Sequence, residues 1–158
     1  MNTFILLLAL SFMPLAGDDA HQGIRVVDSV DVSSAPSEAA HAFAGEQTEI
    51  GESAGLKWRS ATGWFSYSLK TYDDSPLTIL FVIAAGPGDR ETFDVLVDGT
   101  KVATVDREAG QQKPEESKFE VPFPLTRGKV SVTVKLQAHD GLRTARVIEI
   151  RTVQEHLE

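Results

Sequence analysis

The residues best suited to holding a ligand lie in one ten-residue block that begins at Trp58, where three amphipathic aromatic side chains and an arginine occur together. On an exposed surface, the indole of Trp58 or Trp64 can stack on the apolar face of a sugar ring while Arg59 binds hydroxyl groups. Alternation supports a second interpretation, in which Phe65 and Tyr67 face the core, Trp64 covers the opposite face of a sheet and Trp58 closes one end of the fold. The residue types alone leave both interpretations open.

Glu38 and His41 are further candidates, because they lie in an irregular stretch of the sequence and such stretches often carry binding sites. We expect Glu38, His41, Trp58 and Arg59 to converge at one end of the domain, since a long connection can return beside the strand that follows it. In one interpretation these residues, together with Trp64, bind carbohydrate. In the other the cluster is structural, with Arg59 paired to Glu38 and Trp58 packed over them.

The sequence contains none of the common catalytic or metal-binding patterns. It has no cysteine, which excludes disulfides, thiolate nucleophiles and thiolate metal ligands. Its four histidines have no metal-ligand spacing, and the G-x-S-x-G turn of serine hydrolases is missing. No loop resembles a D-x-D-x-D-G calcium site, so we assign no metal and no cofactor, with a structural calcium ion held by loop oxygens as the alternative. We therefore expect a protein that is not an enzyme.

The charge balance restricts the class of partner. The chain has 15 basic and 23 acidic residues, a net charge of −8, and its basic residues are scattered. A chain this acidic repels phosphate backbones and anionic lipid surfaces. We therefore expect no nucleic-acid partner.

The N-terminal residues have the layout of a signal peptide. Residues 1–17 hold an apolar run that is too short to span a membrane, followed by Pro14 and the small residues Ala16 and Gly17. No basic residue precedes the run, so a buried N-terminal strand or helix is the alternative. We expect a signal peptide over 1–17, a flexible leader over 18–23, and a secreted or periplasmic protein without a membrane span.

Short stretches of alternating apolar and polar residues recur along the rest of the chain, with turns of Gly, Pro and Asp between them. The expected strands are 24–32, 65–69, 77–84, 93–97, 102–105, 119–123, 130–136 and 145–153. Pro122 and Pro124 place the sixth of these at an edge, because proline cannot donate to a ladder. The pattern predicts an all-β fold, a single antiparallel β-sandwich of jelly-roll type over 24–153, which we expect to be monomeric. An irregular connection is expected over 33–55 and a frayed tail over 154–158.

Several motifs, taken in order, are similar to those of a known module. They are Ser37-Glu38-x-x-His41, Trp58-Arg59-x-Ala61, Gly63-Trp64-Phe65-Ser66-Tyr67, Phe93 to Gly99, and Gly128-Lys129. Together they resemble the C-terminal β-sandwich module, a domain of unknown function, of bacterial proteins in glycoside hydrolase family 127 and its relatives, the β-L-arabinofuranosidase-like enzymes. The resemblance covers residues 24–153 and implies a β-sandwich in a glycan-processing context.

The resemblance implies an accessory role and no catalysis. Enzymes of that family carry their active site in an upstream helical barrel that uses a cysteine, and this chain has neither. The partner is then a glycan or a glycoside hydrolase. Two functions stay open: weak carbohydrate binding through Glu38, His41, Trp58, Arg59 and Trp64, or a structural or protein-interaction domain that docks a partner enzyme and has no glycan site. The exposure of the two tryptophans is the feature that should discriminate between them.

Overall fold

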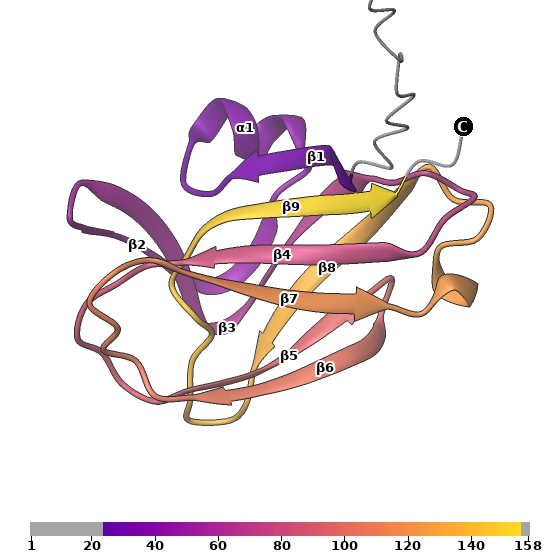
Figure 1. Ribbon diagram of the computed structural model, residues 1–158. Helices are drawn as coiled ribbons and strands as arrows, with labels where there is room; N and C mark the ends of the chain where they lie inside the picture. Colours follow the sequence, from indigo (N-terminus) through magenta and orange to yellow (C-terminus); the bar gives the residue numbers. More distant parts are fainter. Residues whose placement is uncertain (1–23, 156–158) are drawn as a thin grey trace, which may run out of the picture.

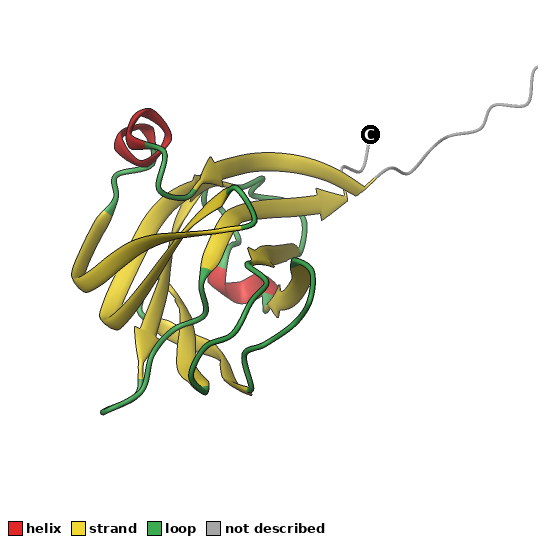
Figure 2. Ribbon diagram, turned by 90° about the vertical axis from the view of Figure 1, so that its left-hand side faces the viewer, coloured by secondary structure: helices red, strands yellow, loops and turns green. Residues whose placement is uncertain are grey.

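Residues 24–155, the part of the chain that the computed structural model describes, form two layers of strands with a short helix at their margin (Figures 1 and 2). The expected signal peptide (1–17) and leader (18–23) lie outside the described residues. The described elements are β1 (Ile24–Asp31), α1 (Ala35–Ala40), β2 (Ala44–Ser53), β3 (Leu56–Lys70), β4 (Leu77–Ile83), β5 (Glu91–Val97), β6 (Thr100–Arg107), β7 (Glu115–Val121), the 3-10 turn η1 (Phe123–Leu125), β8 (Ser131–Ala138) and β9 (Val147–Glu155). Among these elements, no helix is long and apolar enough to cross a membrane.

The described strands pair with one another in antiparallel fashion, and one isolated parallel bridge joins Glu91 of β5 to Arg143. One layer has the order β6-β5-β8-β3-β2 and the other β1-β9-β4-β7, and the two are joined where Arg59 of β3 pairs with Val147 of β9. β7 pairs only with β4 among the described strands, which confirms the edge position expected from Pro122 and Pro124. The chain crosses repeatedly from one layer to the other, as in a jelly roll. The all-β sandwich predicted from the sequence is confirmed.

Period-two alternation decides which side chains fill the space between the layers. In β3, Phe65, Tyr67 and Leu69 are fully buried, and Phe81 of β4 and Phe93 of β5 are buried with them. Each fully buried side chain of this size contributes roughly 1.5–3 kcal/mol through removal of apolar surface from water. The core positions expected for Phe65 and Tyr67 are confirmed.

The stretch 33–55 is more regular than the sequence suggested, because it contains α1 and β2. β2 pairs with β3 along most of its length. Its residues are mostly exposed, so its sequence, AGEQTEIGES, lacks the apolar alternation by which a strand is recognised. α1 has six residues, which is too few to show a helical period. The expectation of an irregular connection was therefore wrong for both elements.

The tail expected to be frayed from residue 154 is also more ordered at its start. Gln154 and Glu155 belong to β9. The Gln154 side chain is 2% exposed; its oxygen accepts hydrogen bonds from the Thr71 hydroxyl and the Tyr72 amide, and its nitrogen donates to the Ser75 carbonyl. A buried amide needs such partners. These three lie in the connection between β3 and β4, so they become neighbours of Gln154 only when the sandwich has closed.

Candidate functional site

The carboxylate of Glu38 and the guanidinium of Arg59 meet inside the protein. Arg59 Nε donates to Glu38 Oε1 at 2.8 Å and Arg59 Nη2 donates to Oε2 at 2.9 Å, a bidentate pair. The Tyr67 hydroxyl and the Ser33 amide also donate to Oε1, at 2.7 and 3.1 Å. Both members of the pair are buried, Glu38 at 8% and Arg59 at 6% exposure. The pairing matches the structural interpretation of these two residues, because little of either side chain faces solvent.

Electrostatics inside this cluster favour the ionised carboxylate. Burial by itself raises the pKa of Glu38, but hydrogen bonds from Arg59, Tyr67 and Ser33 outweigh it and hold that pKa below its ordinary value. Burial and the neighbouring carboxylate raise the pKa of Tyr67 well above its usual range, so its hydroxyl stays a donor. The Arg59 guanidinium also lies over the Phe43 ring, 4.2 Å from its centroid. The cluster is a closed network that joins α1 to β3.

The His41 side chain connects the C-terminal end of α1 to β1. Its Nδ1 lies 2.7 Å from the Ser37 carbonyl oxygen and its Nε2 lies 3.2 Å from Asp28 Oδ1. Burial raises the pKa of Asp28, yet hydrogen bonds from the Lys70 amide, His41 and the Ser29 amide together lower it. The ring of His41 is thus engaged in contacts within the protein.

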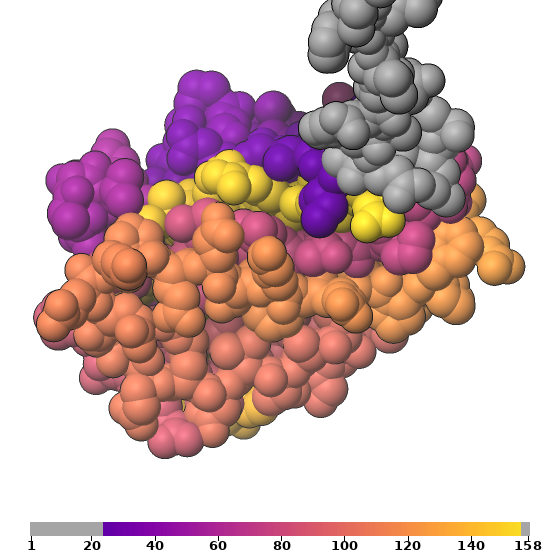
Figure 3. Space-filling view, viewed as in Figure 1, coloured from indigo at the N-terminus to yellow at the C-terminus, as the bar shows by residue number. Residues whose placement is uncertain are grey.

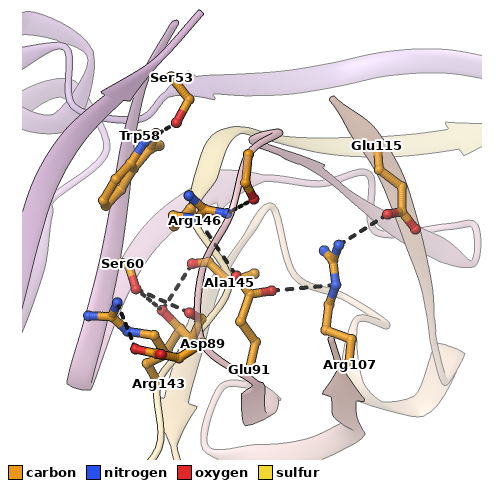
Figure 4. A network of polar contacts seen from close by, with 12 residues as sticks. Ser53, Trp58, Ser60, Asp89, Glu91, Arg107, Glu115, Arg143, Ala145 and Arg146 are labelled. Carbon is orange, nitrogen blue, oxygen red and sulfur yellow. Dashed lines mark hydrogen bonds and ion pairs between the residues drawn. The ribbon is translucent and has the colours of Figure 1, made fainter. Parts of the chain in front are cut away.

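Trp58 is on the other side of β3 from Arg59, since consecutive residues of a strand point to opposite faces. Its indole Nε1 donates to the Ser53 hydroxyl at 3.0 Å, and the Arg146 guanidinium carbon lies 5.6 Å from the ring centroid (Figure 4). The expected convergence of four residues is therefore wrong for Trp58. It lies at the end of the sandwich where β2 turns into β3.

Trp64 occupies a third location. It lies on the outer face of the layer that contains β3, with Lys135 Nζ of β8 at 4.3 Å from its ring centroid. Both tryptophans are half-buried. Their exposure does not discriminate between the two functions as the sequence led us to expect. The five predicted site residues are thus distributed over three places.

A groove of about 380 Å³ opens at the end of the sandwich where Trp58 lies. It is lined by Ser53, Gly86, Pro87, Gly110, Gln111 and Gln112, together with two alanines. These residues come from the β2–β3 turn, the β4–β5 loop and the β6–β7 loop, and Figure 3 shows the first and last of these next to one another. The volume is within the range of small-molecule sites.

Two side chains behind the groove hold its walls in place. Trp58 binds the Ser53 hydroxyl, and Arg146 Nη2 donates to the Gly86 carbonyl at 2.7 Å. Because the same guanidinium lies beside the indole, the β2–β3 turn and the β4–β5 loop are fixed relative to each other (Figure 4). Trp58 therefore acts here as a positioning residue.

Glu91 balances the charges behind the groove, a role that the sequence analysis missed. It is 2% exposed; its Oε1 lies 3.9 Å from Arg146 Nε and its Oε2 lies 3.4 Å from Arg107 Nε. Burial raises the pKa of Glu91, and the nearby Arg107, Arg146 and Arg143 reduce that effect without cancelling it. A pattern in the sequence does point to it, because Glu91 has the same parity as the buried Phe93 and Val95 and must face inward.

Within the described residues, no group of three or more His, Asp or Glu side chains is arranged to hold a metal ion. The chemistry available at the groove is hydrogen bonding by the Ser53 hydroxyl, by the amides of Gln111 and Gln112, and by loop backbone.

Replacing Gly51 with alanine should displace the indole of Trp58, because a Cβ at position 51 would overlap three atoms of that ring. The ring can swing away, so we expect a loss of about 1–3 kcal/mol in unfolding free energy. In a Trp64→Phe background, where Trp58 is the remaining indole, its fluorescence should shift to the red. Ile50→Ala, at the exposed neighbouring position, is the control. An unchanged spectrum for Gly51→Ala would contradict this placement of Trp58.

The fold is similar to that of solved carbohydrate-binding modules. A family 35 module from an environmental isolate has a TM-score of 0.57 at 17% identity, covering 73% of this chain and 88% of that one. The family 35 module from Clostridium thermocellum has a TM-score of 0.54 at 11% identity, covering 70% and 90%. The module CBM36, solved with calcium and xylotriose, has a TM-score of 0.50 at 18% identity, covering 71% and 92%. At these identities the likeness concerns the fold.

In sequence, no curated protein matches the chain. One family model matches residues 24–153, which is nearly all of the described part. The chain therefore belongs to a protein family of unknown function, DUF6805.

Proposed function

We propose that the chain is a non-catalytic carbohydrate-binding module whose ligand lies in the groove at the β2–β3 end of the sandwich. The observation that carries the proposal is the groove itself, about 380 Å³ in volume and walled by small residues, a hydroxyl and two amide side chains. The fold that the chain shares with modules of families 35 and 36 supports it, and one of those modules was solved with xylotriose. An exported protein that accompanies a glycoside hydrolase is the setting we propose for it.

A sugar in this groove would be bound by hydrogen bonds at small, rigid walls. The Ser53 hydroxyl is already oriented by Trp58, and the loops that carry Gly86 and Gln111 are joined by the bond from the Gly86 amide to the Gln111 carbonyl at 2.8 Å. Each new hydrogen bond contributes about 1 kcal/mol net. A few of them give an affinity of about 1 mM for one sugar unit, which corresponds to about −4 kcal/mol.

Filling the groove should abolish binding. Ala54 is an exposed lining residue with φ of +50°, so Ala54→Phe inserts a ring into the groove. Ala42 is a matched control, because it is also an exposed alanine with φ of +50° but lies between α1 and β2. We expect Ala54→Phe to lower the affinity of the protein for polysaccharide at least about tenfold, which corresponds to about 1.4 kcal/mol of binding free energy. Polysaccharide in the gel should retard Ala42→Phe as much as it retards the parent protein.

Affinity electrophoresis in gels containing xylan, arabinan or β-1,3-galactan measures this retention, and thermal unfolding shows that each variant is folded. Equal retention by the two variants would place the ligand elsewhere. A parent protein that no polysaccharide retards would leave the alternative function, a structural or protein-interaction domain that docks a partner enzyme. For that alternative, the contact surface is the groove of about 620 Å³ at the opposite end, where Ile24 is 71% exposed.

A further inference from the structure

We infer that the groove selects an uncharged glycan and that Glu91 determines this selectivity by neutralising the arginines behind it. The inference rests on the proposed function and adds the class of sugar to it. Its basis is the arrangement of charges around the groove, which is separate from the shape that suggests a sugar.

The walls of the groove carry no charged side chain. Its lining consists of Ser53, Gly86, Pro87, Gly110, two glutamines and two alanines. A carboxylate on the sugar would meet only neutral donors on these walls and find no opposite charge there. Burying an ion without an opposite charge is costly, whereas hydroxyl groups are satisfied by hydroxyl, amide and backbone partners.

Arg146 lies beside the groove, and its charge is compensated. It lies directly behind Gly86, where an added Cβ would be 3.8 Å from Arg146 Nη1. One of its nitrogens is bound to the Gly86 carbonyl, its Nε faces Glu91, and its flat face lies beside the ring of Trp58. Arg146 therefore holds the β4–β5 loop in place and leaves little positive potential in the groove to attract an acidic sugar.

The other arginines at this end are paired as well (Figure 4). Arg107 Nη2 donates to Glu115 at 3.1 Å and its Nε faces Glu91. Arg143 pairs with Glu49 and lies 4.0 Å from Asp89. The net charge of −8 on the whole chain also repels polyanions at long range.

Binding of neutral and acidic polysaccharides by the intact protein tests the inference. Xylan, arabinan and β-1,3-galactan are the neutral probes, and polygalacturonate and alginate are the acidic ones. We expect retention by a neutral polysaccharide that is the same in about 0.1 M and about 1 M NaCl, across which the screening length falls from about 10 Å to about 3 Å. Retention by an acidic polysaccharide that disappears in high salt would overturn the inference while leaving carbohydrate binding in place. Retention by neither class would overturn the proposed function and this inference with it.

Glu91→Gln tests the role of the buried carboxylate directly. It keeps the size of the side chain and leaves Arg146 and Arg107 without their shared partner. We expect the variant to gain retention by polygalacturonate at low salt, by about tenfold over the parent. Glu120→Gln, an exposed position that lines the groove at the opposite end, makes the same change in net charge and should show no such gain.

The Glu91→Gln result is read together with thermal unfolding, because the substitution affects a buried group. If the folded variant gains no affinity for polygalacturonate, or if Glu120→Gln gains as much, Glu91 does not determine selectivity and that part of the inference is overturned. If Glu91→Gln fails to fold, Glu115→Gln replaces it, because it removes the other carboxylate bound to Arg107 and leaves the lining of the groove unchanged. The inference then requires a gain in retention by polygalacturonate at low salt, and the absence of that gain in the folded variant would overturn the role given to the compensated arginines.

Discussion

Replacing Arg59 with leucine is expected to lower the free energy of unfolding by about 3–5 kcal/mol, because it leaves the buried carboxylate of Glu38 without its countercharge. Arg59 supplies two of the hydrogen bonds to that carboxylate, and both residues are more than nine-tenths buried. The remaining donors, the Tyr67 hydroxyl and the Ser33 amide, both reach Oε1 and leave Oε2 without a partner. Urea unfolding at neutral pH measures the loss.

The pH dependence of that loss identifies its cause. In the parent protein the pKa of Glu38 lies below its ordinary value of 4.5, so its contribution to stability is present above that pH and is lost as pH falls through the lower folded pKa. In Arg59→Leu, burial remains while the arginine is gone, so the pKa of Glu38 should rise above 4.5. Acidification then protonates the orphaned carboxylate in the folded state and stabilises the variant. The difference in stability between parent and variant should therefore shrink between about pH 7 and about pH 4.

Arg90→Leu is the control for the loss of a paired arginine at the surface. Arg90 makes an equally well-formed bidentate pair with Asp106, but its side chain is 55% exposed. When Arg90 is removed, water can therefore hydrate the Asp106 carboxylate. We expect little change in stability from it. A small effect of Arg59→Leu, or one independent of pH, would contradict the view that the Glu38–Arg59 pair supports the fold.

Replacing Gly63 with alanine is expected to cost about 3 kcal/mol or more, the upper part of the range for overpacking. A Cβ at position 63 would overlap the carbonyl oxygen of Glu46 and come within 3.1 Å of the Glu46 carbonyl carbon. Both atoms are backbone of β2, at the point where the register between β2 and β3 shifts between Glu46 and Thr48. The overlap is relieved only if the two strands move apart, because rotating a side chain does not displace backbone atoms.

Gly55→Ala separates steric overlap from backbone strain. Gly55 lies in the β2–β3 turn with φ of +78°, and an added Cβ there meets nothing within 4 Å. We expect that variant to lose about 1–2 kcal/mol, the cost of the left-handed conformation alone. Thermal or urea unfolding of the two variants measures both costs. A smaller loss for Gly63→Ala than for Gly55→Ala would show that the two strands are not in close backbone contact at this point.

The sequence by itself determined the architecture, because a half-buried strand shows its period of two in any context. Phe65, Tyr67, Phe93 and Val95 could be assigned to the core from alternation, and they are buried. The turn at Asp98-Gly99 could be predicted because both residues tolerate positive φ, and they adopt +48° and +81° there. β2 could not be predicted in this way, since its residues are mostly exposed and carry no such period.

For the site, the sequence identified useful residue types but did not correctly predict which of them contact one another. Glu38 and Arg59 were expected to pair, and they do. Trp58 was expected to join them, but β3 begins at Leu56, two residues before Trp58 and well ahead of the expected strand at 65–69. Once Trp58 and Arg59 are consecutive residues of one strand, they must point to opposite faces.

Only the tertiary structure decided where the groove is and what surrounds it. Its walls come from three connections that are far apart along the chain, near residues 53, 86 and 111. The hydrogen bond from Arg146 to Gly86 and the ion pair of Glu91 with Arg107 join further distant segments behind it. Local alternation fixes which face of a strand a side chain occupies, but the closure of two layers on each other determines which loops meet at their end.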